Sequence, residues 1–250
     1  MPSIDYSLIA DLYDSYVTTR LDVPFYLNQA RGRRQVLELM SGTGRVSLPL
    51  LDAGITLTCI DFTGAMLDRL RAKAEARGLH ADIREMDVCA LALDKQFDLI
   101  MLPFHSFAEV TDLHAQQKAL AAIRKHLLPE GRFICPLHNA PARLKLVDGV
   151  KRVRGRFPVG NEGQTLVLSS VENCYEIPGL VRGTQYYDIF DKDDQLLQHR
   201  EAGVCFYLHT VESFRTLLEE AGFEVEALYG DYEYGSFKAQ ESLFMIWVLK

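Results

Sequence analysis

The order of apolar and polar positions along the chain predicts alternating strands and helices between residues 36 and 137. Short apolar runs predict five strands, at 36–39, 56–61, 81–87, 97–103 and 132–137. Apolar residues at helical spacing predict helices over about 46–54, 63–77 and 112–127. This alternation is typical of a doubly wound, mostly parallel sheet, in which ligands bind beyond the carboxyl ends of the strands.

The pattern changes after about residue 145. Segments rich in Val, Thr, Tyr and Phe predict antiparallel strands near 151–157, 165–175, 181–190 and 196–208, separated by turn clusters such as "GNEG" and "DKDD". The chain then returns to a helix that begins after Thr210 and ends at Gly222, followed by two closing strands, "FEVEALY" and "SLFMIWVLK".

These elements predict one α/β domain over residues 1–250, built on a doubly wound, mostly parallel seven-stranded sheet with an antiparallel β insertion. A chain of 250 residues is long enough to bury one full hydrophobic core. We divide it into four parts: an N-terminal helical cap (1–35), a cofactor-binding core (36–144), the insertion (145–208) and a closing helix and hairpin (209–250).

Charge and composition limit the kinds of partner that the chain is expected to bind. A net charge of −7 argues against sequence-independent binding of nucleic acid, which needs an excess of Lys and Arg. The N-terminus carries acidic residues and no uninterrupted apolar run, so we expect a cytoplasmic protein without a membrane segment. The five cysteines form no C-x-x-C pair, which predicts reduced thiols and no metal site. Small molecules remain as the expected partners, and the exposed insertion is a plausible homodimer surface.

The stretch "ELMSGTGR" at 38–45 predicts a ligand loop between a strand and a helix. Closely spaced glycines, Gly42 and Gly44, let backbone N–H groups face a ligand at short range. A dinucleotide fingerprint would place a third glycine or alanine where this chain has Ser47, and the acid Glu38 would not favour a pyrophosphate.

Two further acids end the next strands. Asp61 follows the second strand, where a carboxylate can accept both hydroxyls of a ribose. Asp87 ends the third strand in "REMDV", where a carboxylate and the next N–H could bind the amino edge of an adenine. Acids at three successive strand ends form a stronger pattern than any one alone.

These motifs resemble those of class I S-adenosylmethionine-dependent methyltransferases. "VLELMSGTGRVSLPLLDAG", "CIDFTGAML", "REMDV", "FDLIMLPFHSF" and "LLPEGRFICPL" follow the family's order over residues 36–137, and "LEEAGFEVEALYGDY" resembles its closing helix and strand. The nearest resemblance within the family is to the small-molecule type with a β insertion before the last helix, which includes amino-sugar N-methyltransferases.

The resemblance implies roles for particular residues. Gly42 and Gly44 would approach the methionine part of S-adenosylmethionine, and Asp61 would bind its ribose. Asp87 and the Val88 amide would bind adenine.

The same resemblance assigns supporting roles around the loop. Glu38 would support the loop and the cofactor's amino group, while Phe62 and Met66 would flank the adenine or ribose. Met40 stands where the family usually has glycine, so the backbone there must reach its conformation without the freedom that glycine gives.

The acceptor site should lie beyond the fourth and fifth strands. His105 and His138 are the candidates for a base or an acceptor-orienting group, since the pKa of histidine lies near neutrality, and Glu109 is a weaker candidate. A loop histidine is more often a surface or packing residue than a base, and the same alternative holds for Glu109. Tyr13 and Tyr16 could cover the cofactor, because aromatic faces attract cations such as a sulfonium, or could simply pack a helix on the sheet.

We therefore predict an S-adenosylmethionine-dependent methyltransferase that acts on a nitrogen or oxygen of a small molecule. One alternative is an NAD(P)-dependent oxidoreductase, which Glu38, Ser47 and the lack of a Tyr-x-x-x-Lys motif make less favourable. The other is a non-catalytic S-adenosylmethionine-binding protein.

Overall fold

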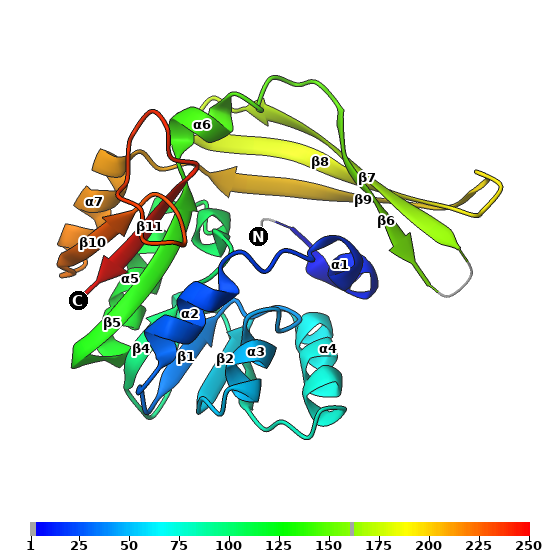
Figure 1. The fold of residues 1–250 in the computed structure, drawn as a ribbon. Helices are drawn as coiled ribbons and strands as arrows, with labels where there is room; N and C mark the ends of the chain where they lie inside the picture. The colour runs from blue at the N-terminus through cyan, green and yellow to red at the C-terminus, as the bar shows by residue number, and fades with distance from the viewer. Residues whose placement is uncertain (1–3, 161–162) are drawn as a thin grey trace.

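Two β-sheets with an N-terminal segment between them make up the computed structural model, which describes residues 4–160 and 163–250 (Figure 1). The large sheet has seven strands in the order β10-β11-β5-β4-β1-β2-β3, and the small sheet has four in the order β6-β7-β8-β9. In the large sheet β11 runs antiparallel to both β5 and β10, while the other pairs are parallel. The expected α/β class, with a mostly parallel seven-stranded sheet and an antiparallel insertion, is confirmed.

The elements of the core follow the predicted alternation. The strands of the large sheet are β1 (Val36–Leu39), β2 (Leu57–Asp61), β3 (Asp82–Glu85), β4 (Phe97–Met101), β5 (Leu127–His138), β10 (Val225–Tyr229) and β11 (Phe244–Leu249). The helices around them are α2 (Val23–Ala30), α3 (Ser47–Asp52), α4 (Gly64–Glu75), α5 (Leu113–His126) and α7 (Val211–Glu220), with short 3-10 helices η2 (Val88–Ala90) and η3 (Ser106–Glu109).

One strand begins earlier than predicted. The segment "LPEG", which lies between the predicted helix and the strand predicted at 132–137, already belongs to β5, and the pairing of β4 with β5 shifts register between Phe97 and Leu99. Gly131 allows this close approach, because a Cβ there would lie 2.9 Å from the carbonyl oxygens of Phe97 and Leu128.

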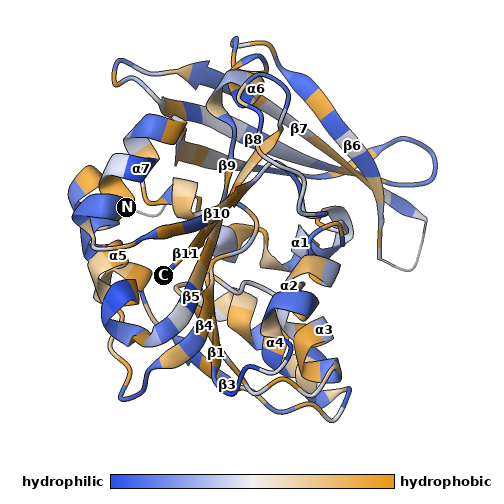
Figure 2. Cartoon of the chain, turned by 60° about the vertical axis from the view of Figure 1, so that its left-hand side comes forward, coloured by the Kyte–Doolittle hydropathy of each residue, from blue (hydrophilic) through white to orange (hydrophobic). Residues whose placement is uncertain are grey.

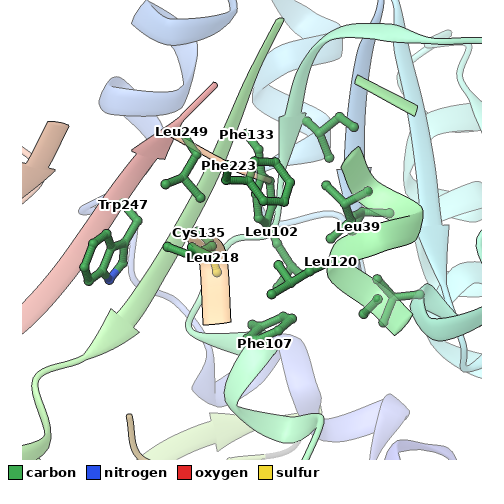
Figure 3. Close-up of a cluster of buried hydrophobic side chains, with 14 of the residues drawn as sticks. Leu39, Leu102, Phe107, Leu120, Phe133, Cys135, Leu218, Phe223, Trp247 and Leu249 are labelled. Carbon is green, nitrogen blue, oxygen red and sulfur yellow. The ribbon is translucent and has the colours of Figure 1, made fainter. Parts of the chain in front are cut away.

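Helices cover both faces of the large sheet, as expected for buried parallel strands. Side chains of α5 and α7 pack on one face with Leu37, Leu39 and Trp247 (Figure 3), whereas α2, α3 and α4 pack on the other with Val36 and Ile246. The central strands are accordingly apolar in Figure 2, and the helices carry polar outer faces.

The insertion sheet lies across one end of this core (Figure 1). It consists of β6 (Arg152–Val159), β7 (Gln164–Cys174), β8 (Leu180–Phe190) and β9 (Leu196–Tyr207), and α6 (Ala140–Leu144) leads into it from β5. Residues 161–162 of the predicted "GNEG" turn lie outside the described residues.

The N-terminal segment fills the space between the two sheets. Its elements are η1 (Tyr6–Leu8) and α1 (Ala10–Tyr16), and Ile9 and Leu12 pack against buried insertion residues, including Leu166 and Tyr187. Among the described residues, no helix combines the length and apolarity needed to cross a bilayer.

Candidate functional site

A cavity of about 380 Å³ opens at the carboxyl ends of β1, β2 and β3. We call it the cofactor cavity. Seven of the residues predicted to bind cofactor line it: Tyr13, Gly42, Asp61, Phe62, Met66, Asp87 and Val88. The topology explains this convergence, because parallel strands bring their carboxyl ends to the same edge of the sheet.

The Asp61 carboxylate lies in the wall of the cofactor cavity. One oxygen accepts the N–H of Gly42 and the other accepts the N–H of Thr63, both at 2.8 Å. Burial raises the pKa of Asp61, and these backbone donors oppose that effect. Each carboxylate oxygen has a second lone pair, so Asp61 can still accept two hydroxyl groups, which fits a ribose.

Asp87 also lines the cofactor cavity. One of its carboxylate oxygens accepts the N–H of Cys89 at 2.8 Å and thereby caps η2, while the side chain remains exposed. This cap fixes the Val88 backbone beside the carboxylate, the pairing expected for an adenine edge.

Glu38 and Gly44 belong to the ligand loop but do not line the cofactor cavity. Glu38 is only 2% exposed, and its carboxyl group accepts a hydrogen bond from Ser47 Oγ at 2.6 Å. Burial raises the pKa of Glu38 to about 8. Gly44 has φ +87°, and a Cβ there would lie 2.2 Å from Leu70 Cδ1, so this glycine lets the loop pack on α4.

Met40, which replaces the usual glycine, lines the cofactor cavity with φ +53°. The backbone therefore adopts the left-handed conformation despite the side chain, at the steric cost that such residues carry.

A second cavity, of about 210 Å³, lies between the ends of β4 and β5 and the insertion sheet. We call it the acceptor cavity. It shares Tyr6, Tyr13 and Glu109 with the cofactor cavity, so the two adjoin at these side chains. The predicted pair His105 and His138 lines the acceptor cavity.

The two histidine rings stack on each other with centroids 4.0 Å apart, and His105 also stacks on Phe244 at 4.9 Å. Burial lowers the pKa of His105 well below its usual value, with a smaller contribution from His138. Burial, together with the nearby Arg143, lowers the pKa of His138 to about 4. Both rings are thus neutral near pH 7, which makes them weak bases but leaves them compatible with a neighbouring sulfonium.

Glu109 lies at the junction of the two cavities, at the end of η3. Its carboxylate accepts a hydrogen bond from Tyr6 Oη at 2.6 Å. Burial, followed by the Glu109 charge, raises the pKa of Tyr6 well above its usual value, so the phenol stays a donor. Tyr13 packs edge-on against both Tyr6 and Tyr16.

Sequence reasoning missed several residues of the acceptor cavity, among them Tyr6, Arg143 and Glu172. The spacing of tyrosines in the N-terminal segment could have indicated Tyr6. Arg143 and Glu172 carry no local signal, because their places depend on how the insertion folds back.

Three other polar side chains, Asn139, Tyr232 and Tyr234, stabilise the structure. The buried Asn139 amide donates to the carbonyls of Ala239 and Ser242 at 2.8 Å and so fastens the loop before β11. Tyr232 packs against Phe25, and the Tyr234 hydroxyl accepts a hydrogen bond from an Asn28 side chain.

β6 is an edge strand of the small sheet, and its arginines each face an acid. Ion pairs join Arg152 to Asp148, Arg154 to Glu172 and Arg156 to Asp194.

Comparison with known proteins agrees with this geometry. Residues 36–131 match the model of a family described as a methyltransferase domain. The cypemycin N-terminal methyltransferase of Streptomyces sp is 26% identical over 203 residues, which cover 80% of this chain and 76% of the relative.

Solved structures share the fold over nearly the whole chain. The CcbJ methyltransferase from Streptomyces caelestis has a TM-score of 0.80 and 21% identity, covering 98% of this chain and 96% of its own. An S-adenosylmethionine-dependent methyltransferase from Clostridium acetobutylicum ATCC 824 has a TM-score of 0.78 and 17% identity, covering 98% of both chains.

Residues 36–131 thus form a methyltransferase domain, and the whole chain has the Rossmann-like methyltransferase fold. The predicted enzyme class, an S-adenosylmethionine-dependent methyltransferase, and the predicted cofactor are confirmed.

Proposed function

We propose that this methyltransferase transfers the methyl group to the nitrogen of a small amine held in the acceptor cavity beside Glu109. The observation that carries the proposal is the junction of the two cavities at Tyr6, Tyr13 and Glu109. Reaction by in-line displacement needs the acceptor and the sulfonium on either side of such a junction.

On the cofactor side, Asp61 would hold the ribose of S-adenosylmethionine, and Asp87 with Val88 would hold the adenine. Gly42 would approach the methionine part, and Glu38 would support the loop from behind. The bound cofactor supplies an electrophilic methyl group on its sulfonium.

Glu109 favours nitrogen over oxygen as the acceptor atom. Attack by a neutral amine moves the positive charge from sulfur to nitrogen, and a carboxylate at the junction stabilises that charge. A hydroxyl acceptor would instead need a base, and the low pKa values of His105 and His138 make both poor bases near neutrality. We assign the two histidines to holding and orienting the acceptor.

The test compares matched acceptors such as cyclohexylamine and cyclohexanol, with methylated product measured by mass spectrometry. We expect transfer to amines. Transfer to alcohols alone, or to no amine while S-adenosylmethionine binds, would contradict the proposal.

A variant then tests the role of Glu109. Glu109→Gln should lower kcat/KM for an amine at least about tenfold, because a charge-assisted hydrogen bond is lost, and should change S-adenosylhomocysteine affinity much less. Glu130→Gln, at an exposed position of β5, is the matched control and should behave like the wild type.

A further inference from the structure

The wall of the acceptor cavity contains a second charged group, Arg143 of α6. Its Nη2 donates to Glu172 at 2.5 Å, and Glu172 is also paired with Arg154 at 3.3 Å. The Glu172 side chain is only 5% exposed, so this ion-pair cluster is built into the contact between the insertion and the core.

The other terminal nitrogen of Arg143 has no such partner. Nη1 is buried and has no hydrogen-bond partner within residues 4–160 and 163–250. The guanidinium also lies over the Phe206 ring, 4.9 Å from its centroid, which fixes its plane. A buried donor without an acceptor is costly, and Arg143 lines the acceptor cavity, so a ligand oxygen bound there would supply the missing acceptor.

The balance of charge in this cluster indicates which kind of ligand oxygen Arg143 would bind. Two arginines, Arg143 and Arg154, share the single carboxylate of Glu172, which leaves one positive charge in excess in this cluster. A carboxylate on the ligand would neutralise that charge, whereas a neutral carbonyl would not. The field of Arg143 also reaches His138 across the wall, since it contributes to the lowered pKa of that ring.

We infer that Arg143 binds a carboxylate of the methyl acceptor, so that the acceptor is a small amino acid with its nitrogen beside Glu109. This inference rests on the proposed function and adds a specificity-determining residue to it. The cavity then matches both ends of the amino acid. Arg143 pairs with the carboxylate, and Glu109 lies beside the nitrogen, which attacks as the neutral amine after its ammonium form has lost one proton to solvent.

The experiment measures kcat/KM for matched pairs that differ in the carboxylate: glycine and methylamine, L-alanine and ethylamine, L-proline and pyrrolidine. Glycinamide is added to separate a carboxylate from a carbonyl. We expect at least one amino acid to exceed its matched amine about tenfold or more, and glycine to exceed glycinamide.

In Arg143→Met, the kcat/KM of each amino acid should approach that of its matched amine, mainly through a higher KM for the amino acid. The affinity for S-adenosylhomocysteine should stay unchanged. Arg182→Met is the matched control, because Arg182 is exposed and lies over Tyr175 rather than in the cavity wall. Should Arg143→Met be too unstable to assay, Arg143→Met/Glu172→Gln removes the same donor without leaving a buried charge.

Equal kcat/KM values for amino acids and their matched amines would overturn this inference. A preference for amino acids that persists in Arg143→Met would overturn it too. Both results would leave the proposed function standing. Transfer to none of these amino acids would also overturn it. Failure of the proposed function has a different signature: no transfer to any amine.

Discussion

Met40 shows how one residue can hold a strained backbone in the wall of a ligand site. Its φ of +53° lies in the region that glycine reaches freely and β-branched residues almost never adopt. We expect Met40→Val to lower the free energy of unfolding by about 1–3 kcal/mol. Met40→Gly should stay within about 1 kcal/mol of the wild type, since relief of strain offsets the entropy of glycine.

Urea unfolding measures both Met40 variants, and calorimetric titration with S-adenosylhomocysteine measures whether the relaxed loop binds more tightly. Equal losses in Met40→Val and Met40→Gly would mean that side-chain packing, not backbone strain, governs this position.

Asp61 is the residue on which the cofactor assignment depends most. Asp61→Asn preserves the shape of the side chain but turns an amide N–H₂ towards the N–H of Gly42 or Thr63, and it removes the negative charge. S-adenosylhomocysteine should then bind at least about tenfold more weakly in calorimetry. Asp68→Asn, at an exposed position of α4, should bind normally; unchanged affinity in Asp61→Asn would reject the ribose role.

At the scale of elements, the N-terminal segment connects the two sheets and lines both cavities. The Arg200 guanidinium of β9 donates to the Leu8 carbonyl at 2.9 Å and pairs with Asp11. Towards the large sheet, the Asp14 carboxylate accepts a hydrogen bond from the hydroxyl of Thr43 in the ligand loop. The same carboxylate forms an ion pair with Lys73 of α4. Movement of this segment would therefore open the cofactor and acceptor cavities together.

Arg200→Met should loosen the segment and raise KM for both S-adenosylmethionine and the acceptor. Hydrogen exchange over residues 6–16 should become faster, while exchange in β1 and β4 stays slow. Arg215→Met, a change on the exposed side of α7, is a control for loss of an arginine. Unchanged exchange over residues 6–16 would show that other contacts hold the segment.

Some residues of the two cavities could be predicted from the sequence, and others could not. The place of Gly42, Asp61 and Asp87 at one cavity could be predicted, because each follows a strand with a clear apolar pattern and parallel topology brings strand ends together. Tyr6 and Arg143 were missed because their places depend on contacts distant in sequence, such as the bond from Tyr6 to Glu109, 103 residues away.

At the scale of the whole molecule, the large sheet supplies the cofactor cavity, and the insertion closes the acceptor cavity over it. His105 and His138 lie half-buried between the large sheet and the insertion, and desolvation there lowers both pKa values. The two rings are therefore neutral in the folded chain, which lowers the free energy of unfolding in acid. A histidine held in its neutral form gains a proton when the chain unfolds at low pH.

This cost predicts a pH-dependent stability. The pKa of His138 falls from 6.5 to about 4 on folding, so its neutral form favours the folded state above pH 6.5, and that stability is lost as pH falls from 6.5 towards 4. The largest effect of this one ring is about 3 kcal/mol, at about 1.4 kcal/mol per pKa unit.

Urea unfolding at pH 7 and pH 5 measures this effect. The difference in the free energy of unfolding between the two pH values should be smaller in His138→Gln than in the wild type, because glutamine does not titrate. His199→Gln, whose ring is exposed and has a raised pKa, should not reduce the acid loss. Parallel losses in the wild type and His138→Gln would mean that other groups dominate acid unfolding and that His138 is not held neutral by the closure of the insertion.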